Sequence, residues 1–187
     1  MDFLIIWEWL GVISALIYVY LATKGYRSCF IFGLVSSVVF VQICFSEKLY
    51  YDTLINSYYI IMSFYGWWSW KNDSGHLRVV SLDWKRFSFY SILILIGCLF
   101  VGFLSQTYTQ ASMPYLDSFT TISAIVATWL MVKKILQNWL IWIIADTVSI
   151  YMYYVKEHHP MAILFLVYTV IAVYGYFQWK QKQKVYA

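Results

Sequence analysis

The stretch YGWWSWKN at residues 65–72 returns near the end of the chain as YGYFQWKQ at residues 174–181. The two stretches align without gaps at an offset of 109 residues (65 to 174). The identities found at this offset include Lys24 with Lys133, Tyr65 with Tyr174, Gly66 with Gly175, Trp70 with Trp179 and Lys71 with Lys180. We therefore predict an internal repeat that relates residues 4–70 to residues 117–178.

The composition is that of an integral membrane protein. Of the 187 residues, 62% are hydrophobic and 12% are charged, and the mean hydropathy is +0.65. A soluble domain is usually about 45–50% apolar and about 25% charged. The apolar start of the chain carries Asp2 and no basic n-region, so it reads as a spanning helix rather than a secretory signal. The three cysteines are widely spaced in apolar surroundings and predict neither a disulfide framework nor a metal site.

Seven segments approach the roughly 20 apolar residues that a helix needs to span a bilayer. These segments are 4–22, 28–46, 51–70, 88–106, 117–132, 138–155 and 160–178. We predict one all-α transmembrane domain, residues 1–187. Because the offset of the repeat crosses four spans, both three-helix repeats have the same orientation. A loop at 71–87 and a linker helix at 88–106 join them, and parallel repeats of this kind occur in transporters.

The basic residues predict how the chain is oriented in the membrane. With the N-terminus outside, eleven of the thirteen lysines and arginines fall on the cytoplasmic side, and only Lys48 and Lys156 lie outside. Cytoplasmic loops carry an excess of positive charge, so this orientation is favoured and the C-terminus lies inside. The net charge of +4 comes from these residues beside the spans, and it is no argument for nucleic-acid binding.

The stretch NWLIWIIAD, residues 138–146, carries the first part of a candidate binding site. Asn138, Trp139, Trp142 and Asp146 recur at helical spacing and share one face. Asp146 lies eight residues into its span, about 12 Å along a membrane core about 30 Å thick. A carboxylate at this depth is costly and marks a functional site by default. Trp139 also suits an interfacial anchor, and Asp146 a hydrogen bond between helices.

A second polar stripe follows one face of the span at 51–70. Its candidate site residues are Asp52, Asn56, Tyr59 and Ser63. Asp52 also suits a helix cap and Asn56 an interhelical hydrogen bond. The repeat aligns Asp146 with Ser37 and Asn56 with Phe165, so the polar groups are not duplicated. Such asymmetry on a duplicated scaffold is what a site for one asymmetric ligand requires.

The residue types of the two stripes indicate the chemistry of the ligand. Tryptophan faces stack on flat rings and attract cations. Asp146 beside them favours a ligand that is cationic or carries hydroxyl groups. We expect no cofactor and no metal, because His158 and His159 stand together without another ligand pattern nearby.

The same stretches resemble the PnuC-type vitamin transporter family. Its characteristic ENWLxW and YGWxxW segments read QNWLIWIIAD at 137–146 and FYGWWSW at 64–70, and LYYDTLINSYY at 49–59 is similar to the family's lead into the third span. The likeness runs from Trp9 to Lys180. It implies a SWEET-like arrangement of three plus one plus three helices, homotrimers, and a bacterial inner membrane with its lipid around the chain.

The resemblance also implies a function. Family members take up a vitamin by facilitated diffusion, and a cytoplasmic kinase phosphorylates the vitamin and traps it. Trp139 and Trp142 match the tryptophans that stack on the ligand ring. Asn56 stands where many nicotinamide riboside transporters have glutamine, and Asp146 where some have asparagine. Nicotinamide riboside is the favoured substrate, and thiamine and then riboflavin are the alternatives.

Other classes fit the sequence less well. A vitamin-binding subunit of an ATP-driven importer binds the same ligands, but its usual form lacks the parallel repeat. A retinal photoreceptor needs a lysine in the last span, and residues 160–178 contain none. An intramembrane hydrolase needs a second acidic or a histidine partner for Asp146. We therefore expect a transporter and not an enzyme.

Overall fold

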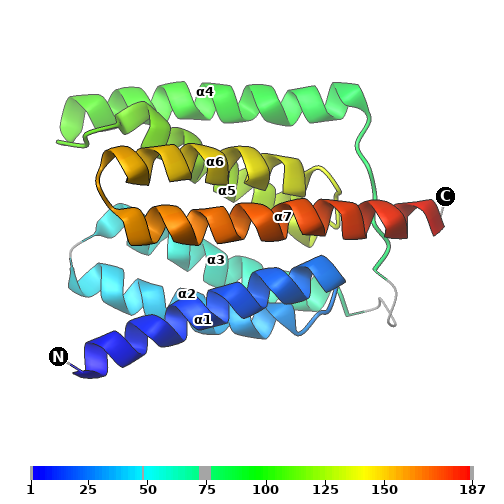
Figure 1. Cartoon of the computed structure of the whole chain (residues 1–187). Coiled ribbons are helices and arrows are strands. Elements are labelled where there is room, and N and C mark those ends of the chain that lie inside the picture. The colour runs from blue at the N-terminus through cyan, green and yellow to red at the C-terminus, as the bar shows by residue number, and fades with distance from the viewer. Residues whose placement is uncertain (1, 48, 72–76, 186–187) are drawn as a thin grey trace.

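The computed structural model describes residues 2–47, 49–71 and 77–185. Over these residues the chain forms seven α-helices and no strand, and the helices lie side by side in one bundle with the termini at opposite ends (Figure 1). The helices are α1 (Asp2–Lys24), α2 (Cys29–Ser46), α3 (Tyr50–Ser69), α4 (Trp84–Tyr108), α5 (Pro114–Val132), α6 (Asn138–Val155) and α7 (His159–Val185). Each overlaps a predicted span over most of its length, which confirms the all-α fold with seven helices.

Five of the helices in the described part of the chain are long and apolar enough to cross a membrane: α1, α2, α4, α5 and α7. The other two, α3 and α6, carry the polar stripes that contain Asn56 and Asp146. Polar groups lower the mean hydropathy of a segment, so the two helices that differ from the rest are those predicted to bind the ligand.

Two helix boundaries differ from the prediction by more than three residues. α4 begins at Trp84 rather than at residue 88, because the side chain of Asp83 caps the helix and accepts a hydrogen bond from the Arg86 backbone N–H at 3.2 Å. α7 continues to Val185, past the predicted end at residue 178. Its extension is rich in lysine and glutamine, which are good helix formers outside an apolar span.

The predicted loop at 71–87 is shorter than expected, and its described part packs against the bundle. Leu77 and Val79 are buried. The backbone N–H of Val80 donates to the Lys134 carbonyl at 2.9 Å, and the Val80 carbonyl accepts from the Leu136 N–H at 2.8 Å. This short parallel bridge fixes the segment to the turn between α5 and α6.

The helix packing is compatible with the predicted repeat. Within each half the helices pack in chain order, α1 on α2 on α3 and α5 on α6 on α7. Between the halves α1 packs on α7 and α3 on α5, and exchanging the halves turns one of these contacts into the other. Among the described residues α4 packs on α5 alone, at the edge of the bundle (Figure 1).

Several contacts occur twice at the offset of 109 residues. Lys24 donates a hydrogen bond to the Tyr174 hydroxyl, and Lys133 donates one to the Tyr65 hydroxyl. Gly25 and its counterpart Lys134 both have left-handed backbone, with φ of 76° and 62°. These pairs support the prediction that the two halves are parallel copies of one unit.

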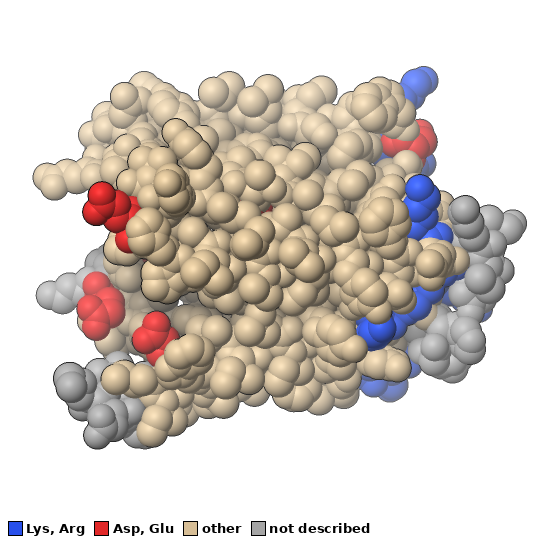
Figure 2. All heavy atoms as spheres, in the orientation of Figure 1, with Lys and Arg blue, Asp and Glu red and all other residues tan. Residues whose placement is uncertain are grey.

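The charged side chains are divided between the two ends of the bundle. Figure 2 shows lysine and arginine gathered at the end where the C-terminus lies, and most of the acidic side chains at the opposite end. We refer to these as the basic end and the acidic end. Positive charge prefers the cytoplasmic side, so this distribution supports the predicted orientation with the basic end inside.

Candidate functional site

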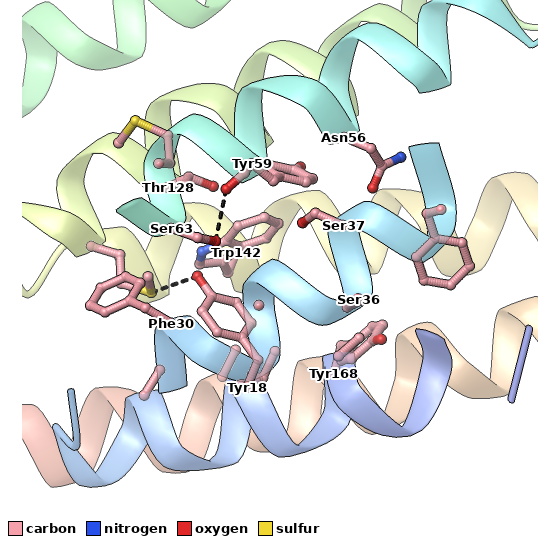
Figure 3. Close-up of a pocket in the computed structure, with 18 of the residues that line it drawn as sticks. Tyr18, Phe30, Ser36, Ser37, Asn56, Tyr59, Ser63, Thr128, Trp142 and Tyr168 are labelled. Atoms are coloured by element: carbon pink, nitrogen blue, oxygen red, sulfur yellow. Dashed lines mark hydrogen bonds between the residues drawn. The ribbon is translucent and has the colours of Figure 1, made fainter. Parts of the chain in front are cut away.

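A cavity of about 270 Å³ lies inside the bundle and is lined by every helix except α4. Its walls are mostly aromatic and aliphatic. Figure 3 shows Tyr18, Tyr59, Trp142 and Tyr168 lying around the same space from four different helices. Among the described residues that line the cavity, Asp146 is the only charged one. The lining therefore combines flat apolar surfaces with a single negative charge.

From the first predicted stripe, Trp139, Trp142 and Asp146 line the cavity and Asn138 does not. Trp139 and Asp146 are buried and Trp142 is half-buried. Asn138 is completely buried in the first turn of α6, where its side-chain amide donates to the Ile135 carbonyl at 2.6 Å. Asn138 thus holds the turn before α6 together, and we leave it out of the proposed site.

From the second stripe, Asn56, Tyr59 and Ser63 line the cavity and Asp52 does not. The Ser63 hydroxyl donates to the Tyr59 carbonyl at 2.8 Å, and the Asn56 amide donates to the Asp52 carbonyl at 2.8 Å. Asp52 is exposed in the first turn of α3 at the acidic end. An acidic residue in a first turn complements the helix dipole. Asp52 is not the cap itself, because the N-cap residue of α3 is Leu49 and the helix start has no side-chain cap hydrogen bond.

The lining residues fall largely into pairs that the repeat relates. At the offset of 109, the pairs in which both members line the cavity are Val19 with Thr128, Ala22 with Met131, Phe30 with Trp139, Gly33 with Trp142, Ser37 with Asp146, Asn56 with Phe165, Tyr59 with Tyr168 and Ser63 with Ala172. The cavity is therefore built from equivalent faces of the two halves. Its chemistry is asymmetric, since Trp142 and Asp146 face the ligand space from α6 while α2 supplies Gly33 and Ser37.

Residues outside the predicted stripes also contribute. Phe30 of α2, Tyr168 of α7 and Tyr18 of α1 are large side chains that line the cavity and that the sequence prediction left out of the site. The repeat contained a signal for two of them, because Phe30 and Tyr168 are the counterparts of Trp139 and Tyr59. The Tyr18 hydroxyl contacts the Met131 sulfur at 3.4 Å, a contact between α1 and α5 that no sequence pattern indicates.

The helices are apolar and surround an internal cavity that holds one buried carboxylate. This architecture is that of a multi-pass membrane protein that binds a small molecule. Residues 5–181 match the family described as "Nicotinamide mononucleotide transporter", and the chain belongs to this family. It is accordingly a membrane transporter and not an enzyme, and the PnuC-type resemblance of the sequence is confirmed.

Similar proteins include the nicotinamide riboside transporter PnuC of Escherichia coli, which is 24% identical over 92% of this chain and 84% of its own length. The protein of the same name from Haemophilus influenzae is 27% identical over 95% of this chain and 81% of its own length. These relatives agree with the predicted location in a bacterial inner membrane.

The fold is also similar to a solved structure. The crystal structure of the vitamin B3 transporter PnuC matches with a TM-score of 0.80 at 20% identity, over 97% of this chain and 83% of the other. At this level of identity the match shows the fold.

Proposed function

We propose that the chain transports nicotinamide riboside through the central cavity by facilitated diffusion, and that a cytoplasmic kinase traps the vitamin by phosphorylation. The observation that carries this proposal is the position of Asp146 and Trp142 on one wall of the cavity. A flat cationic ring is stabilised by the face of Trp142 and by the carboxylate of Asp146 together. The names of the relatives support the same substrate.

The cavity favours the riboside over the mononucleotide. A nicotinamide mononucleotide adds a phosphate group to the same ring and sugar. In the part of the chain that the structure describes, no lysine, arginine or histidine lines the cavity, whereas the carboxylate of Asp146 does. Burying a phosphate without a positive partner is unfavourable, and a nearby carboxylate repels it. We therefore propose that the unphosphorylated nucleoside is the transported form.

Thiamine is the second candidate, and the same residues favour it. Its thiazolium ring is a flat cation, and its hydroxyethyl group is a hydrogen-bonding partner for polar lining residues such as Asn56 and Ser63. Riboflavin is a weaker candidate, because its ring system carries no positive charge to pair with Asp146. A calorimetric titration of the purified protein with the three vitamins ranks them. Nicotinamide riboside should bind at least tenfold more tightly than the others, and a tighter fit of thiamine would reassign the substrate.

Uptake into liposomes tests the mode of transport. We expect purified protein without ATP or an ion gradient to equilibrate labelled nicotinamide riboside across the membrane, and enclosed kinase with ATP to drive accumulation beyond equilibrium. Binding without any flux would instead indicate a binding subunit of an ATP-driven importer. We also propose the homotrimer that the resemblance implies, which mass measurement of the detergent-solubilised protein checks.

A further inference from the structure

Four aromatic rings close the cavity on the side of the basic end. They belong to Phe30, Trp70, Trp139 and Trp179, and none of these residues is more than 2% exposed. Their centroids follow one another at 4.9 Å from Phe30 to Trp70, 6.1 Å from Trp70 to Trp179 and 5.5 Å from Trp179 to Trp139. We call this group the aromatic plug. It is built from two pairs that the repeat relates, Phe30 with Trp139 and Trp70 with Trp179.

The plug lies across the path from the cavity to the basic end. Phe30 and Trp139 stand at the basic-end starts of α2 and α6 and form the floor of the cavity, with Phe30 at one end of it and Asn56 toward the other (Figure 3). Trp70 directly follows α3, and Trp179 lies in the corresponding part of α7. Neither of them lines the cavity, so their rings form a second layer beneath the floor.

Each tryptophan of the second layer is hydrogen-bonded to the opposite half of the molecule. The indole N–H of Trp70 donates to the Val132 carbonyl at 3.0 Å, and that of Trp179 donates to the Ala22 carbonyl at 3.0 Å. These carbonyls lie at the basic ends of α5 and α1. The two bonds therefore join α3 to α5 and α7 to α1, the helix pairs through which the halves meet.

A pair of lysines reinforces the same two junctions. Lys24 of α1 donates to the Tyr174 hydroxyl of α7, and its Nζ lies 4.9 Å from the centre of that ring. Lys133, directly after α5, donates to the Tyr65 hydroxyl of α3, with its Nζ 5.0 Å from the ring centre. Cation–ring contacts of this kind are attractive and break when the helices separate.

Two glycines bring the rings of the floor against the helix backbone. A Cβ added at Gly66 would lie 2.1 Å from the Phe30 ring, and one added at Gly175 would lie 2.8 Å from the Trp139 ring. The floor thus depends on α3 and α7 standing close to α2 and α6. A movement that separates α3 from α5 and α7 from α1 removes the support of the plug.

We infer that the aromatic plug is the gate of the transport pathway at the basic end, and that Trp70 and Trp179 are the latch residues that hold it closed. The inference rests on transport through the cavity as proposed above. In this structure the pathway is closed toward the basic end. Release of the substrate on that side requires both indole hydrogen bonds and both lysine contacts to break together, because the repeat places one of each at either junction.

The native residue Cys29 offers a direct test. It is completely buried, precedes Phe30 and packs in the same core cluster as the plug. In a Cys44→Ser, Cys98→Ser background, a charged maleimide is applied without substrate to inverted membrane vesicles, which present the basic end if it is cytoplasmic. The rate of Cys29 labelling then reports how often the gate opens. Trp70→Phe and Trp179→Phe each keep a ring and remove one indole donor.

Losing one net hydrogen bond shifts an equilibrium by roughly fivefold. We therefore expect each single variant to label roughly fivefold faster, and the double variant roughly 25-fold faster. Trp68→Phe is the matched control, since Trp68 lies in the last turn of α3, two residues before Trp70, and is 69% exposed; its labelling should equal that of the parent. Gly66→Ala, which displaces the Phe30 ring and leaves both indole donors in place, should also label faster.

Labelling from the two sides of the membrane distinguishes a gate at the basic end from a bundle that has loosened throughout. Unchanged labelling in the folded double variant, with gel filtration of the solubilised protein as the check on folding, would overturn the inference. An equal rise when the maleimide is applied to right-side-out vesicles would also overturn it, because a gate at the basic end opens to one side only. The labelling assay contains no substrate, so its result does not depend on whether nicotinamide riboside is the transported molecule. An error in the substrate assignment would be detected separately, by the calorimetric titration.

Discussion

Replacing Asp146 by asparagine removes the single charge from the cavity lining and hardly changes its shape. Asp146 is only 4% exposed, so little water screens its carboxylate from a ligand. A ligand cation about 5 Å away is attracted by about 3 kcal/mol at an effective dielectric constant of about 20. Desolvation of the two charges offsets part of this attraction. The substitution therefore lowers the binding free energy by about 1.5–3 kcal/mol, which raises the dissociation constant roughly 10- to 100-fold.

Calorimetry with a matched pair of ligands isolates the charge. Nicotinamide riboside is cationic, whereas its reduced dihydro form is uncharged and nearly the same size. Asp146→Asn should weaken binding of the cation roughly 10- to 100-fold, and binding of the neutral form by less than about threefold. Asp52→Asn is the control, because it removes a carboxylate that lies outside the cavity, and it should leave both affinities nearly unchanged. Equal losses for the two ligands would refute the charge pairing and assign Asp146 to helix packing.

Three further substitutions test the assignment of individual residues. Trp142→Ala should weaken ligand binding at least about tenfold, because it removes the stacking face. A dissociation constant within about twofold of the parent's in a calorimetric titration would place the stacking face elsewhere. Asn138→Ala should lower the thermal unfolding midpoint, because it removes a buried hydrogen bond that contributes about 1–2 kcal/mol to the stability. Calorimetry should find the ligand affinity unchanged, and a loss of affinity would return Asn138 to the site. Gly25→Ala should lower the unfolding midpoint as well, since φ at residue 25 is 76° and the added Cβ would lie 2.9 Å from the Leu77 side chain. An unchanged midpoint would show that alanine causes no strain at this position.

The sequence predicted the helices well because hydropathy and bounding charges determine where a chain enters a bilayer. The start of α4 was misplaced because its N-terminal turn lies outside the apolar stretch and depends on the cap at Asp83. The wrong boundary at the end of α7 has a similar cause, because polar helix formers prolong the helix beyond the apolar part of the segment.

Helical periodicity located the walls of the cavity that α3 and α6 supply, and it missed the others. It identifies which residues share a face, and Trp142 and Asp146 lie together as expected. It does not tell how far a cavity extends along that face, so Asn138 shares the stripe and yet bonds to the preceding turn. The walls from α1, α2 and α7 depend on packing between distant segments. Of the residues in these walls, Phe30 and Tyr168 were within reach of sequence reasoning, because the repeat pairs them with Trp139 and Tyr59.

The position of α4 has a consequence for how the protein moves. Because α4 packs on α5 and on no other helix of the described chain, it belongs mechanically with the second half. The molecule therefore divides into bodies of three and four helices, although the repeat counts three plus one plus three. Spin labels on α4 and α5 should keep a fixed separation through the transport cycle, whereas labels on α4 and α2 should move relative to each other.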